Sequence, residues 1–260
     1  MSIPAVDWSR AWLTPYRALG EPVALSASLG SNAAALQAAA PRHGIRFVPH
    51  DELPQGDSYE PHVFRTGHVP TRDNLHDFFN GLVWLHLPAS KRRLNALQAG
   101  EIERAGIGAT RGPLRDALTL FDENGVLLDA PPGLWDALLA RDWTRLFVSE
   151  RALWKDARLL VFGHALLEKL TLPRKAATAH VLCAPLPVGE GSATDAALSA
   201  MLDPAWLATK PFCPLPVLGI PGWNAENEDV SFYDDSAVFR PRGPARIIDN
   251  RTPVPRRQSA

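Results

Sequence analysis

Several stretches of the chain repeat apolar residues at helical spacing. In LHDFFNGLVWLH (75–86), the side chains of Leu75, Phe78, Phe79, Leu82 and Val83 fall on one arc at about 100° per residue, which predicts a helix. Proline interrupts this pattern at position 88, and residues 89–106 predict a second helical segment. SNAAALQAAA (31–40) predicts another helix, and its first serine is a good N-cap.

Other stretches carry the shorter pattern of strands. Short strands are predicted over GIRFVP (44–49), YEPHVFRTG (59–67), RLLVF (158–162) and ATAHVLCAPL (177–186). The third of these leads into a helix at Gly163. In LRDALTLFDENGVLLDA (114–130), two apolar runs flank Asn-Gly. This dipeptide favours positive φ in tight turns, so the pattern predicts a β-hairpin with Asn124 and Gly125 at its turn.

The order of these elements predicts the fold class and the domain organisation. Helices and strands do not alternate regularly, which favours α+β: a single domain, residues 1–245, with a small, mainly antiparallel sheet packed by helices. Nine of the 24 prolines lie beyond residue 200, yet this region is too apolar for a free linker. We therefore expect residues 203–245 to form a proline-rich extended arm packed on the domain. Residues 246–260 are expected to form a flexible basic tail.

Composition and charge narrow the classes of function. The chain has 260 residues and is 46% hydrophobic. Its net charge of −1 gives no overall electrostatic attraction to a nucleic acid or an anionic membrane. Its apolar runs are shorter than the ~20 residues of a membrane span, and its start lacks the pattern of a signal peptide. Its two cysteines lack the spacing of a zinc knuckle or a disulfide framework. We expect a cytoplasmic protein that binds neither nucleic acid nor membrane.

The helix predicted over residues 75–86 also carries an unusual polar stripe. His76, Asn80 and Trp84 are spaced i, i+4, i+8, with Asp77 beside them, and no Lys or Glu occurs between positions 74 and 90. Because a solvent-facing arc normally carries such charges, the stripe is expected to face a cleft or a buried polar network. Two interpretations remain open. Asp77 or Asn74 caps the helix beside a half-buried histidine, or His76 and Asp77 are metal ligands or an acid–base pair.

Further candidate groups lie in FGHALLEKL and RGPLRDA. His164 and Glu168 are four residues apart, so they share a helix face and can hold one metal ion or make an ordinary intrahelical contact. Arg115 can bind an anionic group in a forked geometry or neutralise Asp116 or Asp77 in a salt bridge. The acidic residues of DENG are explained by turn chemistry alone.

The chain resembles a family of proteobacterial proteins, the domain of unknown function number 3025. The resemblance rests on HDFFNGLVWLHLP with KRRLN, RDALTLFDENG, FGHALLEKL, LPVLGIPGW, FYDD and VFRP, and it spans residues 45–241. It implies a single-domain bacterial protein and supplies no activity, substrate or cofactor. It also implies that the candidate residues belong to the family's motif blocks, namely His76, Asp77, Asn80, Arg115, Asp116, His164 and Glu168.

Two hypotheses about function follow. In the first, the protein is a metal-dependent hydrolase acting on a small-molecule substrate. Its divalent ion would be held by His76, Asp77, His164 and Glu168, and acid–base chemistry would involve the same polar stripe. Its candidate catalytic residues are His76, Asp77, Asn80, Arg115 and Asp116, with the arginine orienting an anionic group of the substrate. In the second hypothesis, the same residues form a buried polar network in a non-catalytic binding or scaffold protein, which contacts a protein partner through its arm.

Overall fold

The computed structural model describes residues 5–40, 44–106, 112–189 and 192–242. The predicted tail, residues 246–260, lies outside the described residues. Ten α-helices occur in this part of the chain: α1 Arg17–Ser28, α2 Asn32–Ala39, α3 Tyr59–Thr66, α4 Leu75–His86, α5 Pro88–Ala105, α6 Pro113–Asn124, α7 Pro132–Ala140, α8 His164–Lys169, α9 Ser192–Met201 and α10 Pro204–Leu207. Six strands accompany them: β1 Arg46–Pro49, β2 His68–Thr71, β3 Gly125–Asp129, β4 Arg158–Val161, β5 Thr178–Leu182 and β6 Phe212–Pro216.

The strands form two small sheets. The larger sheet has the order β4-β3-β5-β6; its two outer pairings are antiparallel and its central pairing, β3 with β5, is parallel. The other sheet is the parallel pair β1–β2. Strand β3 is buried along Val126, Leu127 and Leu128, as expected for a central strand with both faces covered. The protein thus combines α-helices with two small sheets, and antiparallel pairing predominates in the larger one.

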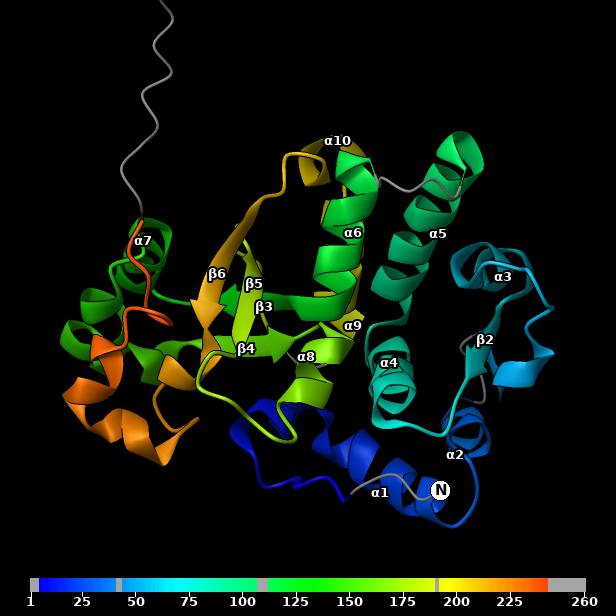
Figure 1. The fold of residues 1–260 in the computed structure, drawn as a ribbon, viewed down its shortest axis with the longest axis horizontal. Helices are drawn as coiled ribbons and strands as arrows, with labels where there is room; N and C mark the ends of the chain where they lie inside the picture. The colour runs from blue at the N-terminus through cyan, green and yellow to red at the C-terminus, as the bar shows by residue number, and fades with distance from the viewer. Residues whose placement is uncertain (1–4, 41–43, 107–111, 190–191, 243–260) are drawn as a thin grey trace, which may run out of the picture.

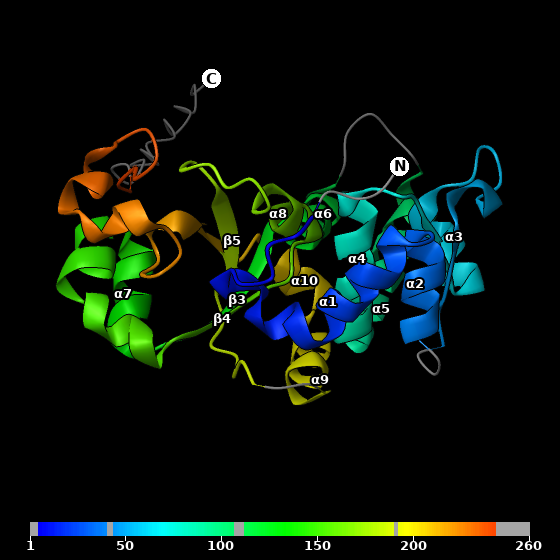
Figure 2. The same ribbon diagram turned by 90° about the horizontal axis from the view of Figure 1, so that it is seen from below.

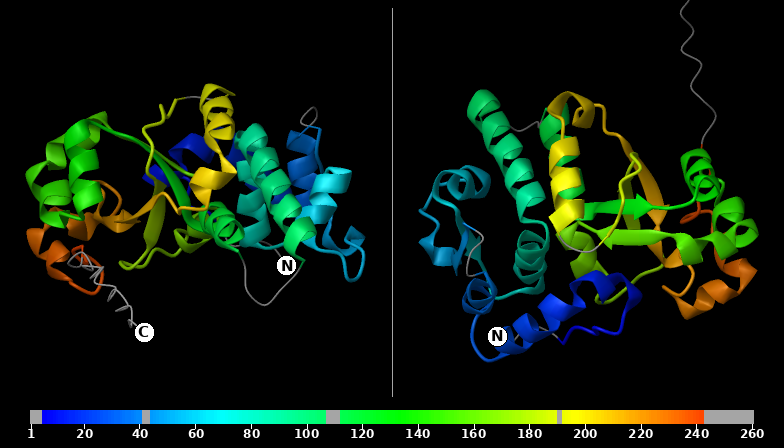
Figure 3. Two further views of the ribbon diagram at one scale, coloured as in Figure 1. Left: turned by 90° about the horizontal axis from the view of Figure 1, so that it is seen from above. Right: turned by 180° about the vertical axis from the view of Figure 1, so that it is seen from behind.

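Helices α8 and α6 lie between the larger sheet and the α4–α5 pair (Figure 1). Seen from below, α1 lies between the larger sheet and α2 (Figure 2). Figure 3 shows α7 and the C-terminal segment at one end of the molecule, beyond the sheet, and α3 at the other. Helix α4 is covered on most sides, because its residues from Phe78 to Leu85 are all buried. None of the helices in the described segments is long and apolar enough to cross a bilayer.

The predicted hairpin at Asn124–Gly125 is wrong. Residues 113–124 form α6, and Gly125 has φ −70°, an ordinary extended value, at the start of β3. The buried side chains Ala117, Leu118 and Phe121 follow helical spacing, so this helix buries one face against the core. Burial of that face outweighs the local turn preference of Asn-Gly.

The predicted strand at residues 59–67 is also wrong. This segment forms α3, which ends at Gly67 with φ 68°, the left-handed conformation that glycine adopts readily after a helix. By contrast, the predicted serine cap of α2 is confirmed, because the Ser31 hydroxyl accepts from the Ala34 amide at 3.2 Å. The break at Pro88 is confirmed too, since it separates α4 from α5.

The segment expected to form an extended arm has more regular structure than predicted. It begins with α10, and β6 then joins the larger sheet beside β5 rather than lying over it. Three short 3-10 helices follow. Leu215, Leu218, Ile220 and Trp223 are all buried, which explains the apolar character of this proline-rich sequence.

Candidate functional site

Three helix ends meet where α4, α6 and α8 come together. Asn74 begins α4, with its side-chain oxygen accepting from the Asp77 amide at 2.7 Å. Helix α6 ends at Asn124, and the chain turns directly into β3. Gly163 separates β4 from α8, and its amide donates to the Gly125 carbonyl at 2.8 Å. These junctions place side chains from three distant parts of the sequence beside one another.

Gly163 permits the closest of these approaches. A β-carbon at this position would lie 2.5 Å from the Asn124 backbone nitrogen and 2.6 Å from the Glu123 carbonyl oxygen. Backbone atoms cannot move aside cheaply, so only glycine lets the start of α8 pack against the end of α6. The next residue, His164, is consequently held beside the last turn of α6.

Two histidines and two carboxylates converge at this junction. The Nε2 atoms of His76 and His164 lie 3.0 Å apart. Glu168 Oε2 lies 3.0 Å from His76 Nδ1, and Glu123 Oε2 lies 3.6 Å from His164 Nε2. One ligand atom each from His76, His164 and Glu123 lies within 4.8 Å of the others. Ligand atoms around a tetrahedral zinc ion with 2.0–2.1 Å bonds are separated by about 3.3 Å, so the two measured separations bracket this value.

The neighbouring carboxylates favour the tautomers that metal binding requires. Glu168 accepts only if His76 carries its proton on Nδ1, which leaves a lone pair on Nε2. His164 Nδ1 lies 3.9 Å from Asp122 Oδ1, so a proton on Nδ1 faces a negative charge. With both protons placed in this way, two Nε2 lone pairs and the Glu123 carboxylate face a common point. Carboxylates that hold the outer nitrogen of a histidine are the usual outer-shell partners of metal ligands.

Burial shapes the ionisation of this cluster. His164 is almost fully buried, and this burial, assisted by Lys91 and His76, lowers its pKa to about 3, although Asp122 opposes the shift. Burial, followed by the charge of Asp122, raises the pKa of Glu123. The imidazole of His164 is therefore neutral at neutral pH, as a ligand must be. A cation beside Glu123 would relieve the cost of its charge.

A buried ion pair stands behind the two histidines. The ammonium of Lys91 donates to Asp122 Oδ1 at 2.5 Å, and these side chains are only 4% and 16% exposed. The ammonium also lies 5.5 Å from the ring centre of Trp84 and 5.9 Å from that of Phe162. Burial is the largest single influence and would raise the pKa of Asp122, but the Lys91 ammonium together with His164 and His76 outweighs it, and the pKa is lowered. Asp122 is thus a fixed negative charge behind His164.

The cluster opens into a cavity of about 260 Å³, close to the lower end of the range for small-molecule pockets. Its lining residues come from the segment before α3, from β2 and from α3, α4, α6 and α8: His50, Leu53, Tyr59, Glu60, Pro70, Arg72, His76, Asp77, Asn80, Asp122, Glu123 and His164. Of the charged residues in this lining, four are acidic and one, Arg72, is basic. The cavity therefore favours a cation.

The far wall of the cavity is held by specific hydrogen bonds. Asn80 Nδ2 donates to the Tyr59 hydroxyl at 3.0 Å, while Asn80 Oδ1 is buried and has no partner among the described residues. Asp77 Oδ2 accepts from the Arg72 amide at 2.7 Å, so this carboxylate stabilises the turn before α4. Arg72 Nη2 donates to His50 Nε2 at 3.0 Å. Asn80 Oδ1 is therefore a buried acceptor whose hydrogen-bonding capacity is unused among the described residues.

The structure brings some of the candidate residues together and separates others. Of the four residues expected to hold a metal ion, His76 lies beside His164 and Glu168, whereas Asp77 turns to the Arg72 amide. Glu168 lies at the outer nitrogen of His76, while the group with metal-ligand spacing contains Glu123 and neither Asp77 nor Glu168. Asp77 and Asn80 line the cavity, and their side chains bond to the Arg72 amide and the Tyr59 hydroxyl rather than to either histidine.

Arg115 and Asp116 lie elsewhere. They occupy the first turn of α6, about 10 Å along the helix axis from Asp122 and Glu123 at its other end. Asp116 forms a half-exposed ion pair with Lys210, and neither residue of this turn lines the cavity. The position of Arg115 therefore gives no support to its expected role in orienting an anionic substrate group.

Three residues of the site, Asp122, Glu123 and Lys91, were not predicted from the sequence. The first two were assigned to a turn, because Asn-Gly was read as a hairpin. A signal was present: Ala117, Leu118 and Phe121 follow helical spacing, which would have placed Asp122 and Glu123 in the last turn of a helix. Nothing in the local pattern around Lys91 distinguishes it from a surface lysine.

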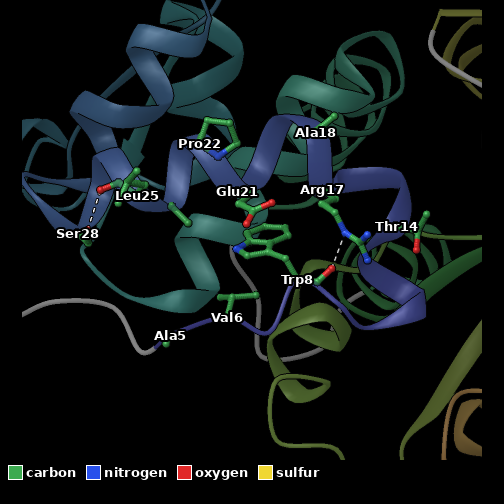
Figure 4. Close-up of a pocket in the computed structure, with 11 residues that line it drawn as sticks. Ala5, Val6, Trp8, Thr14, Arg17, Ala18, Glu21, Pro22, Leu25 and Ser28 are labelled. Carbon is green, nitrogen blue, oxygen red and sulfur yellow. Dashed lines mark hydrogen bonds between the residues drawn. The ribbon is translucent and has the colours of Figure 1, made fainter.

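A larger cavity, of about 1130 Å³, lies along α1 and the segment before it (Figure 4). Its lining is mostly apolar, with Trp8, Pro22 and Leu25 among its side chains. Arg17 Nε donates a hydrogen bond to the Trp8 carbonyl at 2.6 Å, and Glu21 is the other charged residue of this lining. This hollow brings together no group of side chains suited to acid–base or metal chemistry, so its size does not make it the candidate site.

Comparison with known proteins gives a family and no activity. Residues 45–243 match the family described as "Protein of unknown function (DUF3025)". Neither the curated proteins nor the solved structures contain a match to the chain. The matched residues include α4, α6 and α8, and with them all the side chains of the histidine–carboxylate cluster.

Proposed function

The chain belongs to DUF3025, a family whose description assigns no activity, and from the geometry of its site we propose that it is a metal-dependent hydrolase of a small polar substrate. The observation that carries the proposal is the grouping of His76, His164 and Glu123 within 4.8 Å of one another at the edge of a cavity. Two histidines and one glutamate are a ligand set of catalytic zinc sites, where the fourth position is left for water or substrate.

Each residue of the cluster has a distinct role in this proposal. His76 and His164 bind through Nε2, and Glu123 binds through Oε2. Glu168 holds the proton of His76 on Nδ1, and the negative charge of Asp122, 3.9 Å from His164 Nδ1, favours a proton on that atom without a direct hydrogen bond. The bound ion would lower the pKa of a water molecule and polarise the bond to be cleaved. Asn80 and Tyr59, joined by their hydrogen bond, line the cavity and form a wall against which the substrate lies.

The acidic lining supports a neutral or cationic substrate rather than an anionic one. Glu60 and Asp77 add negative charge to the lining, and Arg72 is the basic side chain among the cavity-lining residues. A volume of about 260 Å³ accommodates a small molecule or one end of a larger one. Amides, esters and amino-group-bearing substrates fit this chemistry.

The second candidate is a non-catalytic protein in which the same residues form a structural polar network. The observation that favours it is the deep burial of Lys91 and its position over the rings of Trp84 and Phe162, which ties α5 to α4 and to the residue that follows β4. In that account the Nε2–Nε2 contact is a hydrogen bond between two histidines, with the proton on His164 Nε2. His164 Nδ1 would then present a lone pair toward Asp122, which is electrostatically unfavourable.

An assay of hydrolysis before and after metal removal tests the proposal. Purified protein is treated with a chelator, restored with Zn²⁺ or Mn²⁺, and assayed with chromogenic esters, phosphoesters and aminoacyl anilides. We expect hydrolysis of at least one ester or anilide to disappear on chelation and return with metal. Glu123→Gln should abolish it, while the exposed control Glu103→Gln in α5 should not. Hydrolysis that is absent throughout, or equal with and without metal, contradicts the proposal.

A further inference from the structure

The two cysteines of the chain lie side by side in the larger sheet, although 30 positions separate them. Cys213 in β6 is opposite Val181 in β5, and the Cys183 amide extends the ladder by donating to the Pro211 carbonyl at 2.8 Å. Because side chains two residues apart on a strand point to the same face, Cys183 shares the face of Val181 and therefore that of Cys213. The two Sγ atoms lie 2.8 Å apart.

We propose that Cys183 and Cys213 are a redox-active dithiol that closes to an intramolecular disulfide by exchange with a small-molecule disulfide. The thiols are within an ångström of the bonded separation of about 2.05 Å. Both cysteines are only partly buried, so a small oxidant can reach them. The sequence contains no third cysteine to compete for the pairing. This inference is independent of the proposed hydrolase site.

The surroundings of the pair identify the attacking sulfur. The thiol of Cys183 donates to Cys213 Sγ, and this hydrogen bond, with the positive charges of Arg141 and Arg242, lowers the pKa of Cys213 to about 7. The same contact, followed by burial, raises the pKa of Cys183. A thiol that titrates near ambient pH is the better nucleophile in exchange reactions. Cys213 therefore reacts first.

The exchange takes two balanced steps. The Cys213 thiolate attacks one sulfur of a disulfide such as oxidised glutathione, which forms a mixed disulfide and releases one glutathione thiolate. Cys183 then loses its proton to solvent and attacks Cys213 Sγ, which breaks the mixed disulfide and releases the second glutathione. In total, two protein thiols lose two electrons and two protons, and one small disulfide is reduced to two thiols.

The new bond would close the loop that contains α9 and α10. Helix α9 is tied to α5 because Asp195 accepts from the Ala89 and Ser90 amides, each at 2.8 Å. Constraining a loop of this length removes conformational freedom from the unfolded chain. We expect oxidation to raise the melting temperature by roughly 5–10 °C.

Titration of the full chain in glutathione redox buffers, followed by intact-mass and peptide analysis, tests the proposal. The expected product is a monomer lighter by about 2 Da, the loss of two hydrogens, with a peptide cross-link between Cys183 and Cys213 and a raised melting temperature. Cys183→Ser should trap the mixed disulfide on Cys213, and Cys213→Ser should react much more slowly. The proposal is overturned by two alkylatable thiols in oxidising buffer, by a stable glutathione adduct of the wild-type chain, or by a disulfide-linked dimer.

Discussion

The Nε2 atoms of His76 and His164 face each other at 3.0 Å, although the two residues are 88 positions apart in the sequence. One imidazole comes from the first turn of α4 and the other from the first residue of α8. Each has a carboxylate at its outer nitrogen, Glu168 for His76 and Asp122 for His164. Both Nε2 atoms are thereby left free to bind a cation together with Glu123, and substitutions around them should change cation affinity and stability.

Replacement of Glu168 tests the support given to His76. Glu168→Gln keeps the size of the side chain but removes the charge that holds the Nδ1 proton. Because this carboxylate is about 41% exposed, the change should cost little stability. The affinity for Zn²⁺ should fall about 10- to 100-fold, the usual effect of losing an outer-shell partner. Isothermal titration of the metal-free protein measures this, and an unchanged dissociation constant would argue against the assigned role.

Replacement of Lys91 tests the buried ion pair. Lys91→Met leaves the Asp122 carboxylate buried without its partner, so the free energy of unfolding in urea should fall by about 3–5 kcal/mol. The double variant with Asp122→Asn removes both charges and should be more stable than the single variant. A double variant as unstable as Lys91→Met would show that packing of the lysine stem, rather than the unpaired charge, dominates.

Replacement of Gly163 tests the close approach of α8 to α6. In Gly163→Ala the new methyl meets the backbone of Asn124 and Glu123, so we expect a loss of about 1–3 kcal/mol in unfolding free energy and weaker Zn²⁺ binding. The matched control is Gly100→Ala within α5, where a β-carbon meets no atom within 4 Å. The control should gain up to about 1 kcal/mol. Equal behaviour of the two variants would show that the junction tolerates displacement.

The pH dependence of stability tests the burial of His164. Its pKa is about 3 in the folded protein and near 6.5 in the unfolded chain, so only the unfolded chain takes up this proton as pH falls below 6.5. The contribution of His164 to the free energy of unfolding is therefore complete above pH 6.5. It falls progressively toward pH 3, by up to about 1.4 kcal/mol per pH unit. Urea unfolding of metal-free protein between pH 6.5 and 5 should show a steeper loss for the wild type than for His164→Asn. Parallel slopes would contradict a buried, neutral His164.

Local sequence patterns predicted α2, α4 and α5 but not α3 or α6, whose segments were expected to form strands. The arc of Phe78, Phe79 and Leu82 was sufficient to predict α4, and the serine at position 31 was sufficient to predict the start of α2. Asn-Gly at 124–125 led to a wrong prediction. This dipeptide is typical of hairpin turns, but here it lies where α6 ends and β3 begins. The choice between them depends on the burial of Phe121, which is a tertiary effect.

The candidate site was predictable only in part for the same reason. His76, His164 and Glu168 stood out because they interrupt apolar surroundings on helices. Glu123 could not be connected with them, since its position depends on the end of α6 and on the absence of a side chain at Gly163. Contacts between residues so far apart in sequence depend on tertiary packing, and a short sequence motif does not predict them.

Metal content is the most direct test of the central claim, that His76, His164 and Glu123 bind one divalent cation. Metal-free protein is dialysed against micromolar Zn²⁺, freed of excess ion and measured by elemental analysis, together with His76→Asn, Glu123→Gln and the control Glu103→Gln. We expect one tightly bound ion per chain for the wild type and the control, and a stoichiometry near zero for the other two variants. A wild-type chain without bound ion, or equal stoichiometry in all four proteins, would contradict it.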